Sequence, residues 1–267
     1  MCEQVIICED SMEGILSGVY EAYRIKKEKG IESHAFIHLV TRHPDMYRLF
    51  TEYTAQETNP ENADKVAGTI KARLGSECCY QLCLAMASCF EDKADAGYHT
   101  IVLGLRTNDR RILDRLGEEC VQSAFRCARA SSNELCHMME FTRFRELEGG
   151  ILYAEINAKH HILPFLMPHF ADRLPAENFV IYDKAADIYG LHPGMKPWYL
   201  AQGVEPDSDR LKSTDSEKEY SALFQSFCRS VAIESRMNLR LQASLLPLRF
   251  RPDMTEWKGS GAAGTDL

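Results

Sequence analysis

The stretch EFTRFRELEGGILYAEIN, residues 140–157, decides the fold class of this chain. Apolar and polar residues alternate on both sides of the Gly149-Gly150 pair, which is the pattern of two antiparallel strands joined by a tight turn. NFVIYDKAADIYGL, residues 178–191, repeats the pattern with a turn near residues 184–186. Since each strand finds its partner nearby in the chain, the sequence predicts an α+β fold, with an antiparallel sheet of hairpins packed against helices.

A mostly helical block is predicted before this sheet, over residues 59–137. Its first helix has Asn59 as a cap, Pro60 in the first turn and Gly75 as the stop signal. Near the start of the chain, the apolar run QVIIC at residues 4–8 predicts a strand that leads into another helix.

Residues 1–257 are expected to form a single α+β domain, because 267 residues with 45% hydrophobic side chains suit one sizeable core. The polar, turn-rich residues 201–219 predict an exposed loop. Residues 219–247 then show an amphipathic helical pattern, which Pro247 ends, and residues 258–267 read as a disordered tail.

Composition predicts a cytoplasmic protein that does not enter a membrane. No run of eighteen apolar residues is present, and the acidic start does not resemble a secretion signal. The ten cysteines are therefore expected to be reduced structural thiols, since none of their spacings matches a zinc ribbon or an iron–sulfur site. The net charge of -8 argues against nonspecific coating of nucleic acid, although residues 106–145 and 224–258 are locally basic.

The stretch richest in chemically active side chains is HHILPFLMPHFADRL, residues 160–174. On a helix, steps of four would place His161, His169 and Arg173 along one face. Two imidazoles eight residues apart are not the usual helical metal pair, so we expect no metal site. Hydrogen-bonded core histidines and a polar pocket shared with Arg173 both remain as interpretations.

A second wall for such a pocket is HMMEFTRFREL, residues 137–147. If this stretch is a strand, Phe141 and Arg143 lie on one face and Phe144 on the other. An arginine beside a phenylalanine can hold a phosphate while the ring stacks on a base, although a surface strand with ordinary salt bridges explains the pattern equally well. His137, at its start, could join the same cluster.

Two further candidates come from other parts of the chain. Asp183 closes the strand NFVIYD and could supply a carboxylate for acid–base chemistry beside the imidazoles. ESRMNLRLQ, residues 234–242, carries Arg236 and Asn238, which could contact nucleic acid or lie at a solvated helix end. The phosphate-loop, dinucleotide, nucleophile-elbow and H-E-x-x-H motifs are absent, so no cofactor is predicted and the sequence leaves open whether the chain is an enzyme.

Five stretches together resemble a bacterial family labelled "probable DNA metabolism protein", a domain of unknown function. They reach from the first predicted helix to about residue 257: EDSMEGILSGVYEAY, NADKVAGTIKARL, HMMEFTRFREL, LYAEINAKHHILPFLMPHFADRLPAENFVIYD and ESRMNLRLQASLLPLRFRPDMTEW. The family is encoded beside a radical SAM protein assigned to DNA modification or repair, and its domain is sometimes fused to a uracil-DNA glycosylase-like domain. The resemblance implies a DNA-repair setting but no reaction.

The family's pattern also falls on the candidate site residues. For acid–base chemistry it matches His137, His160, His169 and Asp183, and for contact with nucleic acid or phosphate it matches Arg143, Phe144, Arg173, Arg236 and Asn238. The chain departs from the family at AKHH, residues 158–161, which favours His160 over His161, and at RFRPDM, residues 249–254.

Three hypotheses follow. The leading one is a DNA metabolism or repair protein that acts with a radical SAM partner and binds nucleic acid or a nucleotide through an Arg/His-lined pocket. The second is a stand-alone enzyme, hydrolase or glycosylase-like, on a modified base. The third is a non-catalytic scaffold for the partner protein.

Overall fold

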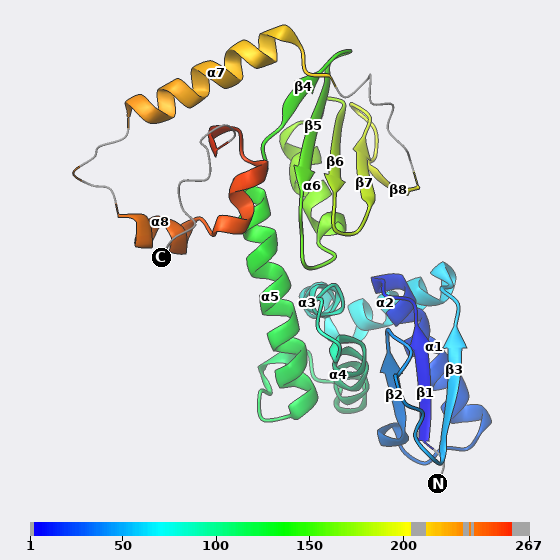
Figure 1. The fold of residues 1–267 in the computed structure, drawn as a ribbon. Helices are drawn as coiled ribbons and strands as arrows, with labels where there is room; N and C mark the ends of the chain where they lie inside the picture. The colour runs from blue at the N-terminus through cyan, green and yellow to red at the C-terminus, as the bar shows by residue number, and fades with distance from the viewer. Residues whose placement is uncertain (1–2, 204–211, 232–234, 236–237, 258–267) are drawn as a thin grey trace. The chain divides into compact units, whose positions relative to one another are not determined.

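The protein is described by a computed structural model that covers residues 3–203, 212–231, 235 and 238–257 (Figure 1). Its helices and two separate sheets make an α+β fold, which confirms the predicted class. The chain divides into two compact units: unit 1 comprises residues 1–134 and 159–162, and unit 2 comprises residues 135–158 and 163–267. A compact unit need not fold alone, so the expectation of a single domain over residues 1–257 stays a prediction.

Unit 1 contains a three-stranded parallel sheet in the order β2-β1-β3. The central strand β1, Glu3–Cys8, pairs in parallel with β2, Ile37–Val40, and with β3, Thr51–Gln56. Helix α1, Met12–Glu28, connects β1 to β2. A parallel sheet differs from the expected antiparallel pairing. The sequence pattern missed it because β2 has only four residues and β3 is mostly polar.

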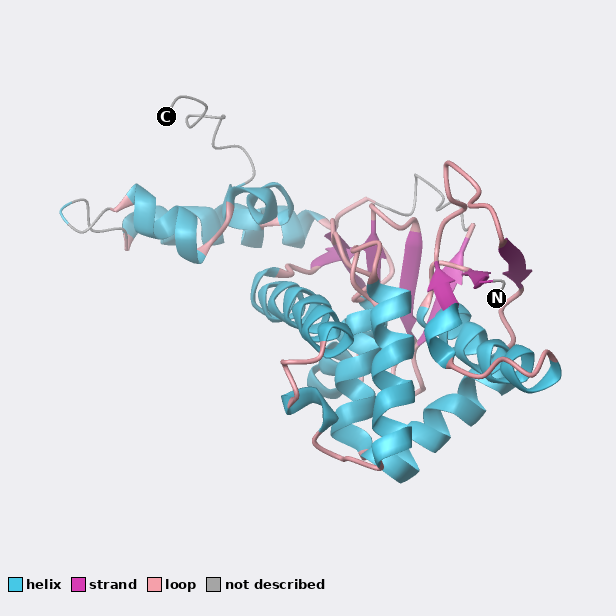
Figure 2. Ribbon diagram, turned by 90° about the horizontal axis from the view of Figure 1, so that it is seen from below, coloured by secondary structure: helices cyan, strands magenta, loops and turns pink. Residues whose placement is uncertain are grey.

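Most of residues 60–141 are helical. The four helices, drawn with the others in cyan in Figure 2, are α2, Pro60–Leu74; α3, Ser76–Met86; α4, Lys93–Thr107; and α5, Glu119–Phe141. Asn59 caps α2 by accepting the Asn62 N–H at 3.1 Å, and Gly75 ends it at a φ of 100°, as its sequence signals predict.

The core of unit 1 forms between the parallel sheet and the helices. At most 1% of the surface is exposed for each of four core residues: Ile6 of β1, Leu39 of β2, Ile15 of α1 and Ile70 of α2. Burying one such side chain stabilises the fold by roughly 1.5–3 kcal/mol. Tyr98 of α4 is also fully buried, so the rotation of α4 about its axis is fixed by packing.

Unit 2 contains a five-stranded mixed sheet in the order β4-β5-β6-β7-β8. The strands are β4, Arg145–Leu147; β5, Ile151–Ile156; β6, Phe179–Asp183; β7, Ile188–His192; and β8, Tyr199–Gln202. The two predicted hairpins, β4–β5 and β6–β7, are confirmed as antiparallel pairs. Between them β5 and β6 pair in parallel, because their connection contains helix α6, Leu163–Arg173, rather than a tight turn.

The first hairpin begins later in the chain than predicted. Helix α5 continues through His137 to Phe141, and the Thr142 N–H still donates to the Met138 carbonyl at 3.1 Å. The expectation that Phe141 and Arg143 share a strand face is therefore wrong, because the helical apolar spacing of α5 extends into the alternating segment. Arg143 and Phe144 lie in the connection to β4.

The predicted helix over residues 219–247 is described as two helices, α7, Asp215–Ser230, and α8, Leu239–Leu245. The apolar stripe of α7 is largely exposed, with Tyr220 70% and Phe227 58% accessible. The predicted loop overlaps β8 and α7 at its two ends, its residues 204–211 lie outside the described residues, and so does the predicted tail, 258–267. Like the other helices in the described part of the chain, α7 and α8 lack the length and apolar character needed to cross a bilayer.

Candidate functional site

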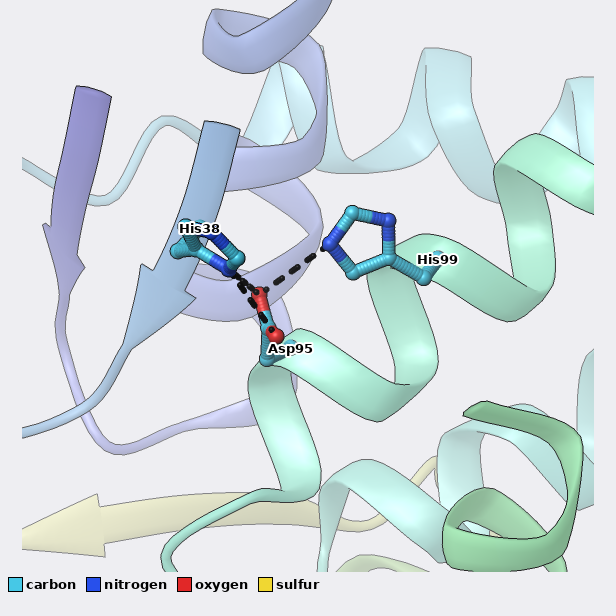
Figure 3. A group of neighbouring side chains, drawn as sticks. All are labelled: His38, Asp95 and His99. Carbon is cyan, nitrogen blue, oxygen red and sulfur yellow. Dashed lines mark hydrogen bonds and ion pairs between the residues drawn. The ribbon is translucent and has the colours of Figure 1, made fainter. Parts of the chain in front are cut away.

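Two imidazoles and a carboxylate meet in unit 1, where β2 lies beside α4 (Figure 3). Asp95 lies between the rings: His38 Nδ1 is 3.2 Å from Asp95 Oδ2, and His99 Nε2 is 3.5 Å from Asp95 Oδ1. The three side chains are each about one fifth to one third exposed. We call this group the His–Asp–His cluster.

The local sequence explains how the cluster forms. Asp95 and His99 are four residues apart on α4, so they share one helix face. His38 lies on β2 between the buried residues Ile37 and Leu39, and strand alternation turns its side chain away from the core. The Leu39 N–H donates to Asp95 Oδ1 at 3.0 Å, which fixes the carboxylate against the strand.

Mutual hydrogen bonding shifts the proton affinities of the cluster. Burial by itself would raise the pKa of Asp95, but hydrogen bonds from His38 and His99 and their charges outweigh it, and the pKa of this carboxyl lies well below its usual value. The hydrogen bond to Asp95 raises the pKa of His38 above its usual value, against the opposing effect of burial. The carboxylate is thus held ionised, and it favours the protonated form of the His38 imidazole beside it.

The cluster opens onto a pocket of about 1010 Å³. Its charged lining is mostly acidic, with five carboxylates against two cations: Glu32, Asp92, Asp95, Glu118 and Glu119 against Lys26 and Arg106. The pocket also contains His34, whose Nδ1 lies 2.6 Å from the Tyr98 hydroxyl, and burial lowers the pKa of His34 to about 4. A cavity of this size suits a small molecule or one nucleoside.

A second group of charged side chains in unit 1 surrounds the buried ammonium of Lys93, which is not accessible to a ligand. The ammonium of Lys93 is 2% exposed, donates to the Ser88 carbonyl at 2.7 Å and lies 2.5 Å from Asp10 Oδ1. His161 Nε2 is 3.8 Å from the same oxygen. Burial by itself would raise the pKa of Asp10, but His161 and Lys93 outweigh it and lower the pKa to about 2. Because Lys93 is fully buried and paired, its ammonium is not free to bind a ligand, and loss of Asp10 would leave a buried charge without its counterion.

The predicted catalytic residues are divided between the units. His160 belongs to unit 1, is 8% exposed, and accepts the Cys89 N–H on Nδ1 at 3.0 Å. His137, His169 and Asp183 belong to unit 2. The ring of His137 stacks on Phe141, with centroids 5.5 Å apart and an interplanar angle of 10°. The ring of His169 lies edge-on to Phe170, with centroids 5.0 Å apart and an interplanar angle of 81°. Asp183 is 1% exposed and accepts the Ala185 N–H at 3.1 Å, in the turn between β6 and β7.

The predicted nucleic-acid residues have equally varied surroundings. Arg143 pairs with Glu256 at 2.9 Å, and Phe144 packs edge-to-face on Phe170 and Phe179 at 5.0 and 5.6 Å. Asn238 caps α8 by accepting the Leu241 N–H at 3.0 Å. Arg173 is exposed at the end of α6, and Arg236 lies outside the described residues. Their roles in binding stay predictions.

Sequence reasoning missed the His–Asp–His cluster. Two of its three members could have been found from the sequence, because DAGYH, residues 95–99, places an acid and a histidine four residues apart on a predicted helix. The third member, His38, lies 57 residues before Asp95 and reaches it only through the packing of β2 beside α4.

No curated protein matches the chain. A family model described as "Domain of unknown function (DUF4130)" matches residues 91–256, a stretch that includes Asp95 and His99 of the cluster but not His38. Because the match covers more than half of the sequence, the chain belongs to the DUF4130 family.

Proposed function

We propose that this protein is a hydrolytic enzyme of DNA metabolism, which acts on a modified base or nucleoside in the pocket of unit 1 and works with a radical SAM partner. The observation that carries the proposal is the His–Asp–His cluster at the wall of an open pocket large enough for a nucleoside. The DNA setting and the partner rest on the family resemblance of the sequence.

The charge of the pocket favours the base over the phosphate of such a substrate. Five carboxylates against two cations repel a phosphate group but attract the amino and ring N–H donors of a nucleobase. Tyr23, also in the lining, offers an aromatic face against which a base can pack.

The chemistry that suits the cluster is hydrolysis. A water molecule gives a proton to the cluster, its oxygen forms a bond to the electrophilic carbon of the base, and the leaving nitrogen departs after taking a proton back. Asp95 keeps the neighbouring imidazoles oriented and stabilises their charged forms during the transfer. A positioned acid–base group of this kind contributes roughly 10²–10⁴-fold to a rate.

The test is turnover of oligonucleotides and nucleosides that carry modified bases, by the full chain with and without the co-purified radical SAM protein. We expect Asp95→Asn to lower turnover by about 100-fold or more. Asp64→Asn, an exposed α2 residue outside the pocket, removes the same charge and leaves turnover unchanged. Turnover that survives Asp95→Asn, or no turnover on any modified base under either condition, rejects the proposal.

A second candidate function, binding of nucleic acid through its phosphates, is favoured by one observation in unit 2. Arg173 is exposed, forms no hydrogen bond or ion pair with any residue that the structure describes, and follows His169 by one helical turn. A free guanidinium at a helix surface suits a phosphate. Arg143 is less available because it is already paired with Glu256.

The partner and the compartment belong to the same proposal. The radical SAM protein is expected to bind this chain directly, in the cytoplasm, where the iron–sulfur cluster of such an enzyme stays reduced. Co-purification of the two tagged proteins at physiological salt tests the association, and its failure leaves turnover by the chain alone as the remaining part of the proposal.

A further inference from the structure

We propose that His38, Asp95 and His99 bind a divalent transition-metal ion, with at least one coordination position open to the pocket of unit 1. This inference names a cofactor for the site under "Proposed function". Its substrate rests on that proposal, but the binding of the ion rests on the geometry of the cluster alone.

The spacing of the donor atoms is the first argument. One nitrogen from each imidazole and one carboxylate oxygen all lie within 4.8 Å of one another. Measured to the single oxygen Asp95 Oδ1, the distances are 3.3 Å from His38 Nδ1 and 3.5 Å from His99 Nε2. A tetrahedral ion with bonds of about 2.0–2.1 Å holds its ligand atoms about 3.3 Å apart, which matches both distances to Asp95. The two imidazole nitrogens lie within 4.8 Å of each other and would close to this spacing around the ion.

The types of donor select the class of ion. Two imidazoles and one carboxylate suit zinc or iron(II), whereas calcium and magnesium prefer oxygen ligands throughout. Three protein ligands, with the remaining position open to solvent, are the arrangement of catalytic rather than structural zinc sites. The pocket beside the cluster supplies the space for a water molecule or a substrate atom at that position.

The surroundings of the cluster favour a cation in two ways. The Leu39 N–H donates to Asp95 Oδ1 at 3.0 Å, which orients the carboxylate as outer hydrogen bonds do in metal sites. Asp92 is paired with Arg126, but the other acidic side chains of the lining, Glu32, Glu118 and Glu119, lower the electrostatic potential of the pocket and concentrate cations near it. A bound ion would in turn offset the repulsion between this lining and a phosphorylated substrate.

The chemical consequence is a water molecule that ionises near neutral pH. A zinc ion held here would lower the pKa of its bound water from that of bulk water toward about 7. With the imidazoles holding the ion, the proton of that water would pass to solvent or to a carboxylate of the lining rather than to the cluster. The water oxygen would form the bond to the substrate carbon, while the bond from that carbon to the leaving nitrogen breaks and the nitrogen takes up a proton. The three protein ligands keep the ion in place and orient its open position toward the pocket.

The test measures binding of the metal itself, without substrate. The full chain is freed of metal with a chelator and titrated with Zn²⁺ by calorimetry and with Co²⁺ by visible absorption. We expect one ion per chain, with a cobalt spectrum typical of nitrogen and oxygen ligands. Asp95→Asn and His99→Gln should each weaken binding by about 100-fold or more.

Two variants control for charge and for histidine content. Glu118→Gln removes one negative charge from the same pocket but no ligand, and His169→Gln removes a histidine of unit 2. Both should keep one Zn²⁺ site, with at most a severalfold loss of affinity in Glu118→Gln. Equal losses in Glu118→Gln and Asp95→Asn would mean that the pocket attracts cations only by its charge, and would overturn the proposal.

The wild-type protein provides a measurement that does not depend on folding of the variants. Cobalt held by cysteine thiolates gives intense sulfur-to-metal absorption in the near ultraviolet. That band, or no bound cobalt, overturns the proposal, as does Zn²⁺ affinity no greater than that for Mg²⁺. Metal binding at the cluster without turnover of any modified base rejects the proposed function alone, whereas turnover with no ion bound in either titration rejects the metal site alone.

Discussion

The histidines of the two units have different kinds of neighbours. In unit 1, His38 and His99 contact Asp95, and His34 contacts the hydroxyl of Tyr98. In unit 2 the rings of all three histidines pack against phenylalanine: His137 on Phe141, His169 on Phe170 and His192 on Phe179. His192 Nδ1 also lies 2.9 Å from the Glu177 carbonyl, and His160 of unit 1 packs near Phe90, so the clearest difference is the carboxylate shared by His38 and His99. A polar neighbour tunes the proton affinity and the donor role of an imidazole, whereas a phenyl ring mainly supplies packing.

This difference shows why a count of histidines along the chain is a poor guide to chemistry. The stretch with three histidines in ten residues, 160–169, contributes one buried hydrogen-bonded ring, one ring near Asp10 and one ring on Phe170. The cluster with the geometry of a reactive site comes instead from isolated histidines in β2 and α4. The fold brings two imidazoles to one carboxylate in the cluster, whereas in the 160–169 stretch only His161 lies near Asp10, at 3.8 Å.

The largest effect that can test the comparison is expected at Phe144. If its ring is part of the unit 2 core rather than a platform for a base, Phe144→Ala should lower the free energy of unfolding by about 3 kcal/mol, because the edge-to-face contacts with Phe170 and Phe179 are lost. Urea denaturation followed by circular dichroism measures this loss. Phe144→Leu keeps most of the apolar volume and should cost less than half as much; a stable Phe144→Ala protein with weakened DNA binding would return Phe144 to the role predicted from the sequence.

A smaller effect is expected at Asp10 in unit 1, where a charged pair supports the fold. Asp10→Asn leaves the buried ammonium of Lys93 without its counterion. We expect a loss of about 2 kcal/mol at pH 7, below the usual cost of breaking a buried pair because Asp10 is itself 37% exposed. Thermal or urea unfolding at fixed pH measures it, with Asp64→Asn on the exposed face of α2 as the charge control.

The same pair predicts the direction of a pH dependence. The pKa of Asp10 is lowered to about 2 from an ordinary value of 3.8, so its contribution is present above pH 4 and is lost as the pH falls toward 2. Unfolding curves between pH 5 and 2 should therefore fall less steeply in Asp10→Asn than in the wild type. Parallel curves would show that Lys93 and His161 do not hold this carboxyl ionised.

The sequence predicted the parts of the fold whose signals are local. Both hairpins, and the helix that begins at Asn59 and ends at Gly75, were readable because turn glycines, caps and alternation act over a few residues. The parallel sheet was not, because β1 must pair with Ile37–Val40 across the whole of α1 and with Thr51–Gln56, which has no apolar face. Nothing in a short window distinguishes such strands from loops.

The candidate site follows the same rule. Asp95 and His99 were within reach of a helical-spacing argument, but His38 joins them through tertiary packing. The site residues predicted from the sequence were chosen for their chemical type, but several of them make structural contacts in the fold. Arg143 pairs with Glu256, Asn238 caps the first turn of α8, and Phe144 packs on two aromatic rings. Such pairings cannot be read from residue type alone.

The smallest effect on stability, and the sharpest contrast within unit 2, is expected between Arg143 and Arg173. Arg143→Ala removes a partly buried ion pair with Glu256 and should cost about 1 kcal/mol, whereas Arg173→Ala, at an exposed helix end, should change stability by less than about 0.5 kcal/mol. If unit 2 binds nucleic acid through free cations, Arg173→Ala should weaken binding more than Arg143→Ala does, the reverse of their order in stability. Arg173→Ala should then reduce the slope of log affinity against log salt by about one, while Arg143→Ala changes it little. Fluorescence anisotropy of a labelled single strand at several salt concentrations measures both slopes, and identical slopes in the two variants and the wild type would place the phosphate contacts elsewhere in the chain.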